Sequence, residues 1–297
     1  MLISSRIGSL TRLFGFVQID LPGTLAVADG RYVLREGEEE RVLVVETHGA
    51  PPPPRRKRRK PRAVQAEAKP GPLPLARVTL VRAFDAFDGE DAAGTWLERA
   101  AGEDESIDAL VADALAALNQ ALHAHAVASG DPHLQTLTPQ HAAATRLGYG
   151  SGQQVAVGEF SAAREVDVHT GASSRRRRDD ELRPQERVAA VLGGRERFDA
   201  CETLLLRARA DLDAGRTREA ALQLRVGMEA LLMELRDALD DPDHKTDMTA
   251  IESRRDDTVK LATSALSGDL GPDESSRLVD LLSLCERILR RRRILQG

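Results

Sequence analysis

A dense run of like charges sets the first limit on how this chain folds. The prolines Pro51–Pro54 are followed by seven cations within the eight positions 55–62. Prolines hold an extended backbone that lacks internal hydrogen bonds, and neighbouring cations repel one another. We therefore expect residues 51–62, called the basic arm below, to be exposed to solvent and to lie outside any hydrophobic core.

A basic arm of this kind binds polyanions by displacing their condensed counterions. The sequence therefore predicts contact with nucleic acid or another polyanion. The predicted contact residues are the cations of the arm: Arg55, Arg56, Lys57, Arg58, Arg59, Lys60 and Arg62. An alternative stays open, because ten acidic residues lie between Asp85 and Asp113 with Arg99 as the only cation among them. The arm could pair with these acids, or serve only to keep the chain in solution.

The composition is that of a globular protein. The chain has 297 residues, of which 41% are hydrophobic and 30% charged, enough to bury one large or two ordinary cores. Aromatic residues make up only 3%, which favours cores of Leu, Val and Ala between helices. The excess of Arg over Lys and the single asparagine, Asn119, are typical of GC-rich bacterial coding.

Cysteine usage and hydropathy predict a cytoplasmic location. The only two cysteines, Cys201 and Cys285, fall at apolar positions of helical patterns, so we expect buried, reduced thiols and no disulfide framework. No stretch has the length and apolar character of an export signal or a membrane span. We expect no membrane contact, and the sequence leaves the oligomeric state open.

The first 168 residues predict an α+β domain with a mainly antiparallel sheet. Short apolar runs alternate with turn residues up to about position 50, and Asp29-Gly30 is a strong signal for a two-residue hairpin in a β-meander. The segment 42–45 is apolar on both faces, as expected of an interior strand. A strand pattern resumes at 75, which makes residues 51–74 a disordered insertion loop within one sheet.

The rest of this domain predicts helices and a sheet edge. A long amphipathic helix is indicated by apolar residues from Ile107 to Leu122, and a shorter helix by residues 139–147. The glycines at 148, 150 and 152 are expected to form a turn that leads into a strand at 155–160. Residues 163–168 are expected to complete the sheet.

The C-terminal part predicts a four-helix bundle over residues 182–295, after a charged linker at 169–181. Apolar residues recur every three or four positions along two neighbouring helices, which Gly215 separates. We expect these two helices to form an antiparallel hairpin, followed by a third helix at 246–267 and a fourth that buries Cys285. The apolar positions of the hairpin are Phe198, Cys201, Leu205, Ala208 and Leu212, then Ala221, Leu224, Met228, Leu231, Leu235 and Ala238.

No motif predicts catalysis, a metal or a cofactor. Four histidines lie within nineteen residues: His123, His125, His133 and His141. Residues two apart on a helix point about 200° apart, so His123 and His125 cannot share one ion on a helix. The glycines at 148–152 follow a helical segment and precede a strand, which is the wrong context for a dinucleotide loop. We therefore predict no metal site and no cofactor, and we do not expect an enzyme.

The hairpin from Arg207 to Leu239 resembles the HEPN class of helical domains. The resemblance is carried by the run Ala-Gly-Arg-Thr-Arg-Glu-Ala-Ala-Leu-Gln-Leu at 214–224 and by Glu229-Ala-Leu-Leu after it. Many HEPN proteins are RNases that use an Arg followed by a His four to six residues later. Here seven residues separate Arg236 from His244, and Pro242 lies between them. The resemblance therefore implies a member without this catalytic pair.

The sequence as a whole predicts a non-enzymatic binding or assembly module whose basic arm contacts a polyanion. One alternative is an RNA-processing enzyme of the HEPN kind, which would bring Arg236 and His244 into one pocket. Another is a purely protein-binding scaffold, which would expose an apolar stripe on a helix.

Overall fold

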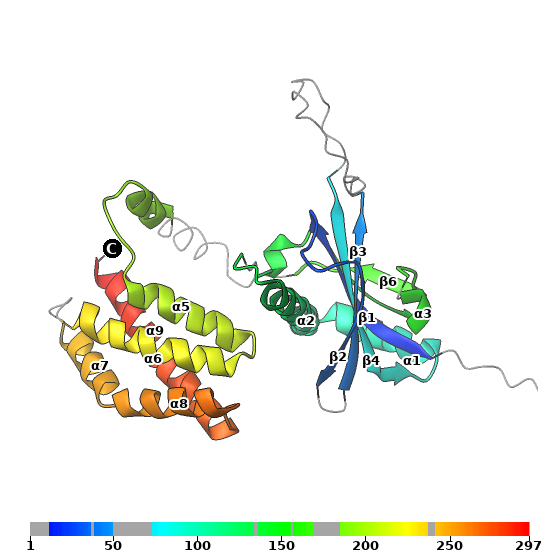
Figure 1. Ribbon diagram of the computed structural model, residues 1–297. Helices are drawn as coiled ribbons and strands as arrows, with labels where there is room; N and C mark the ends of the chain where they lie inside the picture. Colours follow the sequence, from blue (N-terminus) through cyan, green and yellow to red (C-terminus); the bar gives the residue numbers. More distant parts are fainter. Residues whose placement is uncertain are drawn as a thin grey trace, which may run out of the picture. The chain divides into compact units, whose positions relative to one another are not determined.

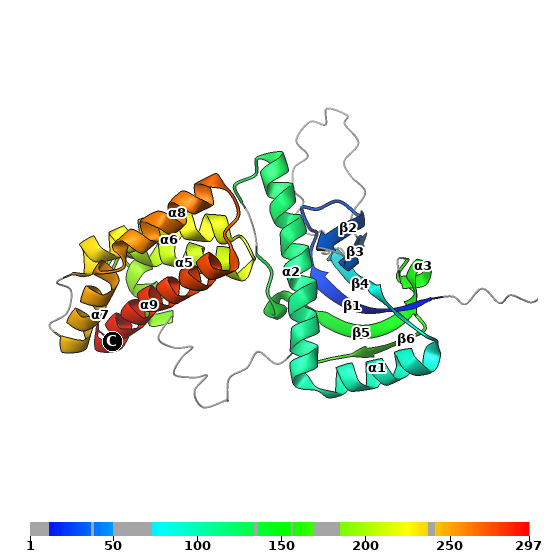
Figure 2. The same cartoon turned by 90° about the horizontal axis from the view of Figure 1, so that it is seen from below.

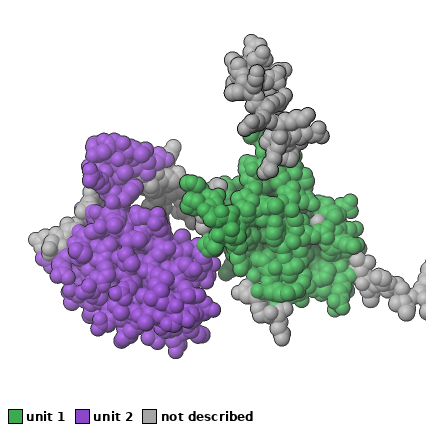
Figure 3. Space-filling model, in the orientation of Figure 1, with its two compact units in different colours: residues 1–171 green, residues 172–297 purple. Residues whose placement is uncertain are grey.

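The computed structural model describes residues 12–36, 39–49, 73–133, 136–155, 157–168, 185–236 and 241–296. The chain divides into two compact units, residues 1–171 and residues 172–297 (Figure 3). The basic arm, the predicted linker at 169–181 and Ala238 lie outside the described residues. The predicted α+β class is confirmed, with an antiparallel sheet in the first unit and helices in the second (Figure 1).

The first unit is a six-stranded antiparallel sheet in the order β2-β3-β4-β1-β5-β6. The strands are β1 (Leu13–Pro22), β2 (Gly30–Glu36), β3 (Glu39–His48), β4 (Leu75–Phe87), β5 (Ala144–Ser151) and β6 (Ala162–Glu165). The strand β4 pairs with β3 directly, so the prediction that the chain rejoins one sheet after the insertion is confirmed. The segment 42–45 lies on β3, between β2 and β4, as expected of an interior strand.

Helices cover the two faces of this sheet unequally (Figure 2). The helices are α1 (Glu90–Gly102), α2 (Asp104–Ser129), the 3-10 turn η1 (Pro139–His141) and the short α3 (Gly152–Val155). The main core lies between α1, α2 and the face of β1 that carries Val17 and Ile19. On the opposite face, Val155 of α3 packs on Phe16 and Val81. The predicted long helix is α2, whereas α1 was not anticipated as a separate helix.

The predicted β-meander is wrong in its first turn. Residues 24–28 form no strand, and β1 lies between β4 and β5, away from β2. Asp29 therefore does not close a hairpin. Its carboxylate instead accepts hydrogen bonds from the backbone N (3.0 Å) and Oγ1 (2.7 Å) of Thr47 on β3. The carboxylate thereby holds the start of β2 against the end of β3.

Two further predictions in this unit are corrected. Residues 139–147 form only the short η1 followed by the start of β5, because the chain from Ala144 onward pairs with β1. Val155 ends α3, and residues 157–160 form a turn and a loop, so the strand predicted at 155–160 is wrong for these described residues. The expected completion of the sheet by residues 163–168 is confirmed for its first residues, since β6 (Ala162–Glu165) pairs with β5, whereas residues 166–168 are not in a strand.

The second unit packs five helices around one core, and residues 185–192 are also helical. The five are α5 (Ala200–Asp213), α6 (Thr217–Leu235), α7 (Pro242–Glu252), α8 (Arg255–Ser267) and α9 (Pro272–Gln296). The predicted hairpin is present, because Glu234 near the end of α6 accepts hydrogen bonds from the backbone N atoms of Ala200 and Cys201 at the start of α5. The predicted third helix is divided into α7 and α8 at Ser253 and Arg254, so five helices instead of four surround the core in the described part of this unit.

Among the described residues, the apolar positions predicted for the hairpin contribute to this core, with one exception. Cys201, Leu205, Leu224 and Leu231 are among the side chains that the core buries, and Cys285 on α9 is buried with them. The two thiols are free and buried, as predicted. Phe198 is the exception: it precedes α5, is 52% exposed and carries the guanidinium of Arg187 over its ring at 5.0 Å.

Candidate functional site

The predicted contact residues of the basic arm, Arg55 to Arg62, lie outside the described residues, but the strands on both sides of the insertion are described. His48, at the end of β3, is the register partner of Leu75 at the start of β4. The backbone N of Gly23 donates to the carbonyl of Pro74 at 2.7 Å. The strands that flank the insertion, β3 and β4, therefore end and begin at neighbouring positions at one end of the sheet.

A buried ion-pair network lies near this end of the sheet, on the face opposite α2. Asp20 on β1 accepts from Nε of Arg77 on β4 at 2.8 Å and from a terminal nitrogen of Arg146 on β5 at 2.7 Å. Burial alone would raise the pKa of Asp20, but the hydrogen bonds from the two arginines outweigh it and lower the pKa below its usual value. Beside it, Nε2 of Gln18 donates to Oγ1 of Thr79 at 3.2 Å. These groups satisfy one another, so we interpret the network as structural.

Some carboxylates of the acidic stretch from Asp85 to Asp113 form ion pairs with arginines in the described part of the chain. Arg164 on β6 pairs with Glu98 at 2.6 Å. Arg41 on β3 pairs with Asp113 on α2. Asp85, the first acid of the stretch, lies near the end of β4 that is remote from the insertion. Two acids are therefore already committed to other arginines, and this weakens the alternative in which the basic arm pairs with the stretch.

The residues compared with the HEPN catalytic pair occupy different environments. The side chain of Arg236 is 60% exposed and pairs with Glu252 at 2.8 Å. His244 is fully buried, and its Nε2 lies 2.9 Å from the carbonyl of Leu235, so this nitrogen is the donor. Its Nδ1 is buried without a hydrogen-bond partner. A histidine so placed has no surface through which to touch an RNA substrate.

His141 and the glycines of β5, from which the sequence predicted neither a metal site nor a cofactor loop, take part in the local backbone structure. His141 caps η1 through Thr138, whose backbone N lies 3.0 Å from Nδ1 of His141. Within the described ranges, no three His, Cys, Asp or Glu residues are grouped so that they could hold a metal ion. Gly148 and Gly150 lie inside β5 and not in a turn.

No helix among the described residues combines the length and apolar character needed to cross a membrane.

The arginines at the end of α9 mainly tie helices together. Arg291 pairs with Asp247 at 3.2 Å and with Asp243 at 2.9 Å, both on α7. Arg292 pairs with Asp199, the residue that caps α5. These ion pairs give the basic run at 287–293 a structural role that its position at a helix end did not reveal.

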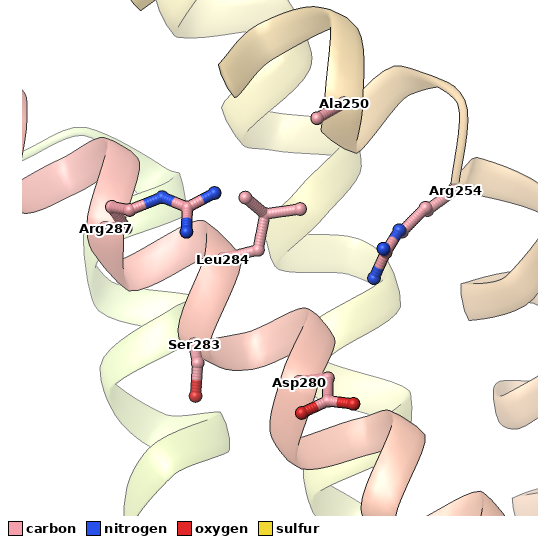
Figure 4. Close-up of a pocket in the computed structure, with 6 residues that line it drawn as sticks. All are labelled: Ala250, Arg254, Asp280, Ser283, Leu284 and Arg287. Atoms are coloured by element: carbon pink, nitrogen blue, oxygen red, sulfur yellow. The ribbon is translucent and has the colours of Figure 1, made fainter. Parts of the chain in front are cut away.

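A groove of about 410 Å³ lies between α7 and α9 (Figure 4). Arg254, at the break between α7 and α8, and Arg287, on α9, lie on opposite sides of Leu284 in this view. The other lining residues are Ala250, Asp280 and Ser283. The groove thus combines two guanidinium groups with a small apolar floor, an arrangement suited to an anionic group carried on an apolar body.

Sequence reasoning missed this groove because it depends on the helix break at Ser253 and Arg254. The available signal was the pair Arg254-Arg255 followed by Asp256-Asp257, since acidic residues favour the first turn of a helix. No glycine or proline marks this break, so the pattern was interpreted as one continuous helix.

Comparison with known proteins yields no relative from which a function could be inferred. No protein-family model matches the chain. No curated protein and no solved structure matches it either.

Proposed function

We propose that this protein is a non-enzymatic binding or assembly module that uses its basic arm to contact nucleic acid or another polyanion. The observation that carries the proposal is a run of seven cations in an insertion between β3 and β4, neighbouring strands whose facing ends, His48 and Leu75, are register partners. A rigid sheet can present such an insertion to a partner without rearrangement of the fold. The net charge of −5 means that the rest of the chain contributes little attraction to a polyanion.

The occupied acids Glu98 and Asp113 support binding to an external polyanion over internal pairing. We also propose a cytoplasmic location. The two cysteines are free and buried, and free thiols persist in a reducing compartment. Full burial of His244 argues against the alternative of an RNA-processing enzyme of the HEPN kind.

The second candidate is a protein-binding scaffold, and one observation favours it. On the outer face of α6, Val226 is 55% exposed and Met233 is 86% exposed. These residues lie seven positions apart, on one side of the helix. A partner helix could cover this short apolar stripe. Replacing Met233 with Lys would then abolish the complex with this partner, as measured by sedimentation, while leaving polyanion binding unchanged.

The test of the main proposal is a salt series of binding to mixed-sequence RNA and duplex DNA, followed by fluorescence anisotropy. Serine at positions 55 to 60 removes six cations and should weaken binding to every sequence alike. The slope of log affinity against log salt should flatten by up to about 5 units on duplex DNA. The matched control replaces Arg175, Arg176, Arg177 and Arg178 with serine, which removes four cations elsewhere.

The control variant should retain the wild-type slope on the same RNA and DNA. A slope that falls equally in the control would show that total charge, and not the arm, governs binding. Absence of salt-sensitive binding by the wild type to either nucleic acid would end the nucleic-acid interpretation.

A further inference from the structure

We propose that the groove between α7 and α9 binds an oxyanion carried on an apolar body, held by Arg254 and Arg287 and seated on Leu284 and Ala250. This site lies in the helical unit and is independent of the basic arm. Its volume of about 410 Å³ falls within the range of small-molecule sites in proteins, about 300–1,000 Å³.

The first indication is that Arg254 has no ion-pair partner in the described part of the chain. This residue is the N-cap of α8, where the helix dipole disfavours a cation. Within the described part of the chain its guanidinium makes no ion pair, although its neighbour Arg255 pairs with Glu229 at 2.6 Å. Residues that contradict local preferences without compensation are expected at functional sites. An anion in the groove would supply an ion-pair partner for Arg254.

Arg287 provides the second cation and retains binding capacity. One terminal nitrogen pairs with Asp247 at 3.1 Å, and the side chain is 56% exposed. A guanidinium carries five N–H donors, so this contact leaves others for a ligand. Asp247 also pairs with Arg291, and its charge is therefore shared between two arginines.

The apolar floor selects for more than a bare anion. Leu284 is 7% exposed and belongs to the core of the unit, so it forms a fixed surface at the base of the groove. A ligand with an apolar part beside its carboxylate or phosphate would cover this surface and gain from leaving water. Carboxylates and phosphates both match the planar fork of arginine, so the chemistry of this groove suits either group.

Asp280 is the one lining residue that opposes an anion. Its carboxylate makes no ion pair with Arg254 or any other cation in the described part of the chain, and it lies on the Arg254 side of the groove (Figure 4). Its charge repels an oxyanion and should limit the affinity of the wild type. Neutralising this residue therefore distinguishes an anion site from a pair of arginines that serve only to balance Asp280.

The experiment measures binding of phenyl phosphate and phenylacetate to the full chain by ligand-observed NMR, with benzyl alcohol as the neutral control. Saturable binding of at least one anion, with much weaker binding of benzyl alcohol, is expected. The anion that binds more tightly identifies phosphate or carboxylate as the preferred group. Equal binding of benzyl alcohol, or no saturable binding of either anion, would overturn the proposal.

Variants assign the binding to the groove. Arg254→Gln should weaken anion binding by about ten- to a hundredfold, the typical effect of losing a charged hydrogen bond. Arg290→Gln, an exposed arginine on the same helix as Arg287 but outside the groove, should bind as the wild type does. Asp280→Asn should bind more tightly. Wild-type affinity in Arg254→Gln, or unchanged affinity in Asp280→Asn, would contradict the proposed site.

The variant with serine at positions 55 to 60 separates this site from the basic arm. Anion binding should persist in that variant with unchanged affinity. Loss of phenyl phosphate and phenylacetate binding there would assign the interaction to the arm and refute the groove.

Discussion

The ring of Phe16 on β1 occupies the space beside Gly148 on β5, so that a Cβ atom at position 148 would lie 2.5 Å from Cζ of Phe16. The same Cβ would lie 2.5 Å from the backbone oxygen of Ala162 on β6. The strands β1, β5 and β6 can keep their register here only because position 148 has no side chain.

We predict that Gly148→Ala destabilises the first unit by about 3 kcal/mol, the upper part of the usual range for overpacking, because a strand backbone cannot move aside as a side chain can. The measurement is the free energy of unfolding from denaturant titration. Gly102→Ala is the matched control, since a Cβ there meets nothing within 4 Å at the end of α1. Unchanged stability of Gly148→Ala would mean that β6 is free to shift.

This contact explains why the glycines were misinterpreted from sequence. Gly148 and Gly150 look like turn residues, because glycine most often relaxes the backbone. Here the backbone is extended. Gly148 is required because a side chain at this position would collide with Phe16, which lies more than a hundred residues earlier in the chain. A close approach between distant strands leaves no local signal, whereas the alternating apolar pattern after position 75 correctly predicted β4.

Removal of the buried leucines of α6 should destabilise the second unit. Leu224 and Leu231 are fully buried in its core. Leu224→Ala or Leu231→Ala should therefore lower the free energy of unfolding by about 2–5 kcal/mol through lost contacts and a cavity. Met233→Ala, on the same helix but 86% exposed, is the control and should change it by less than about 0.5 kcal/mol. Equal effects of all three substitutions would contradict the assigned inner face of α6.

The same helices show what periodicity predicts and what it omits. Steps of three and four residues from Cys201 to Leu235 located one buried face correctly, because burial repeats with the helical turn. The break at Arg254 was missed, since α7 and α8 both keep apolar residues facing the core on either side of it. The candidate groove follows from this break and from the packing of α7 on α9, neither of which local sequence encodes.

The two thiols should be unreactive in the folded protein. Burial raises the pKa of Cys201 to about 12, and the adjacent Glu234 adds to the effect. Burial also raises the pKa of Cys285 to about 12. At pH 8 a thiol reagent should label neither residue in native protein and both in denaturant. Rapid native labelling would show that the core opens.

Because both thiols hold their protons more tightly when folded, their contribution to stability is fully present below about pH 9. It is lost as the pH rises from about 9 to about 12. Cys201→Ser should reduce this alkaline loss of stability.

Neutralising Asp20 should destabilise the sheet and alter its response to acid. Asp20→Asn leaves Arg77 and Arg146 without their shared carboxylate, and removal of one partner of a buried ion pair costs about 3–5 kcal/mol. About a quarter of each arginine side chain is exposed, so water compensates part of the loss and about 3 kcal/mol is expected. The matched control is Glu98→Gln, which removes an exposed ion pair with Arg164 and should cost less than about 1 kcal/mol.

The acid response follows from the direction of the pKa shift of Asp20. The hydrogen bonds from Arg77 and Arg146 outweigh burial and hold the pKa below the usual value of 3.8, so the carboxylate stabilises the folded state at pH values above that value. This stabilisation is lost as the pH falls through the lowered pKa. In denaturant titrations between about pH 5 and pH 2, the wild type should therefore lose stability more steeply than Asp20→Asn. Parallel acid profiles of the two proteins would show that folding does not lower the pKa of Asp20.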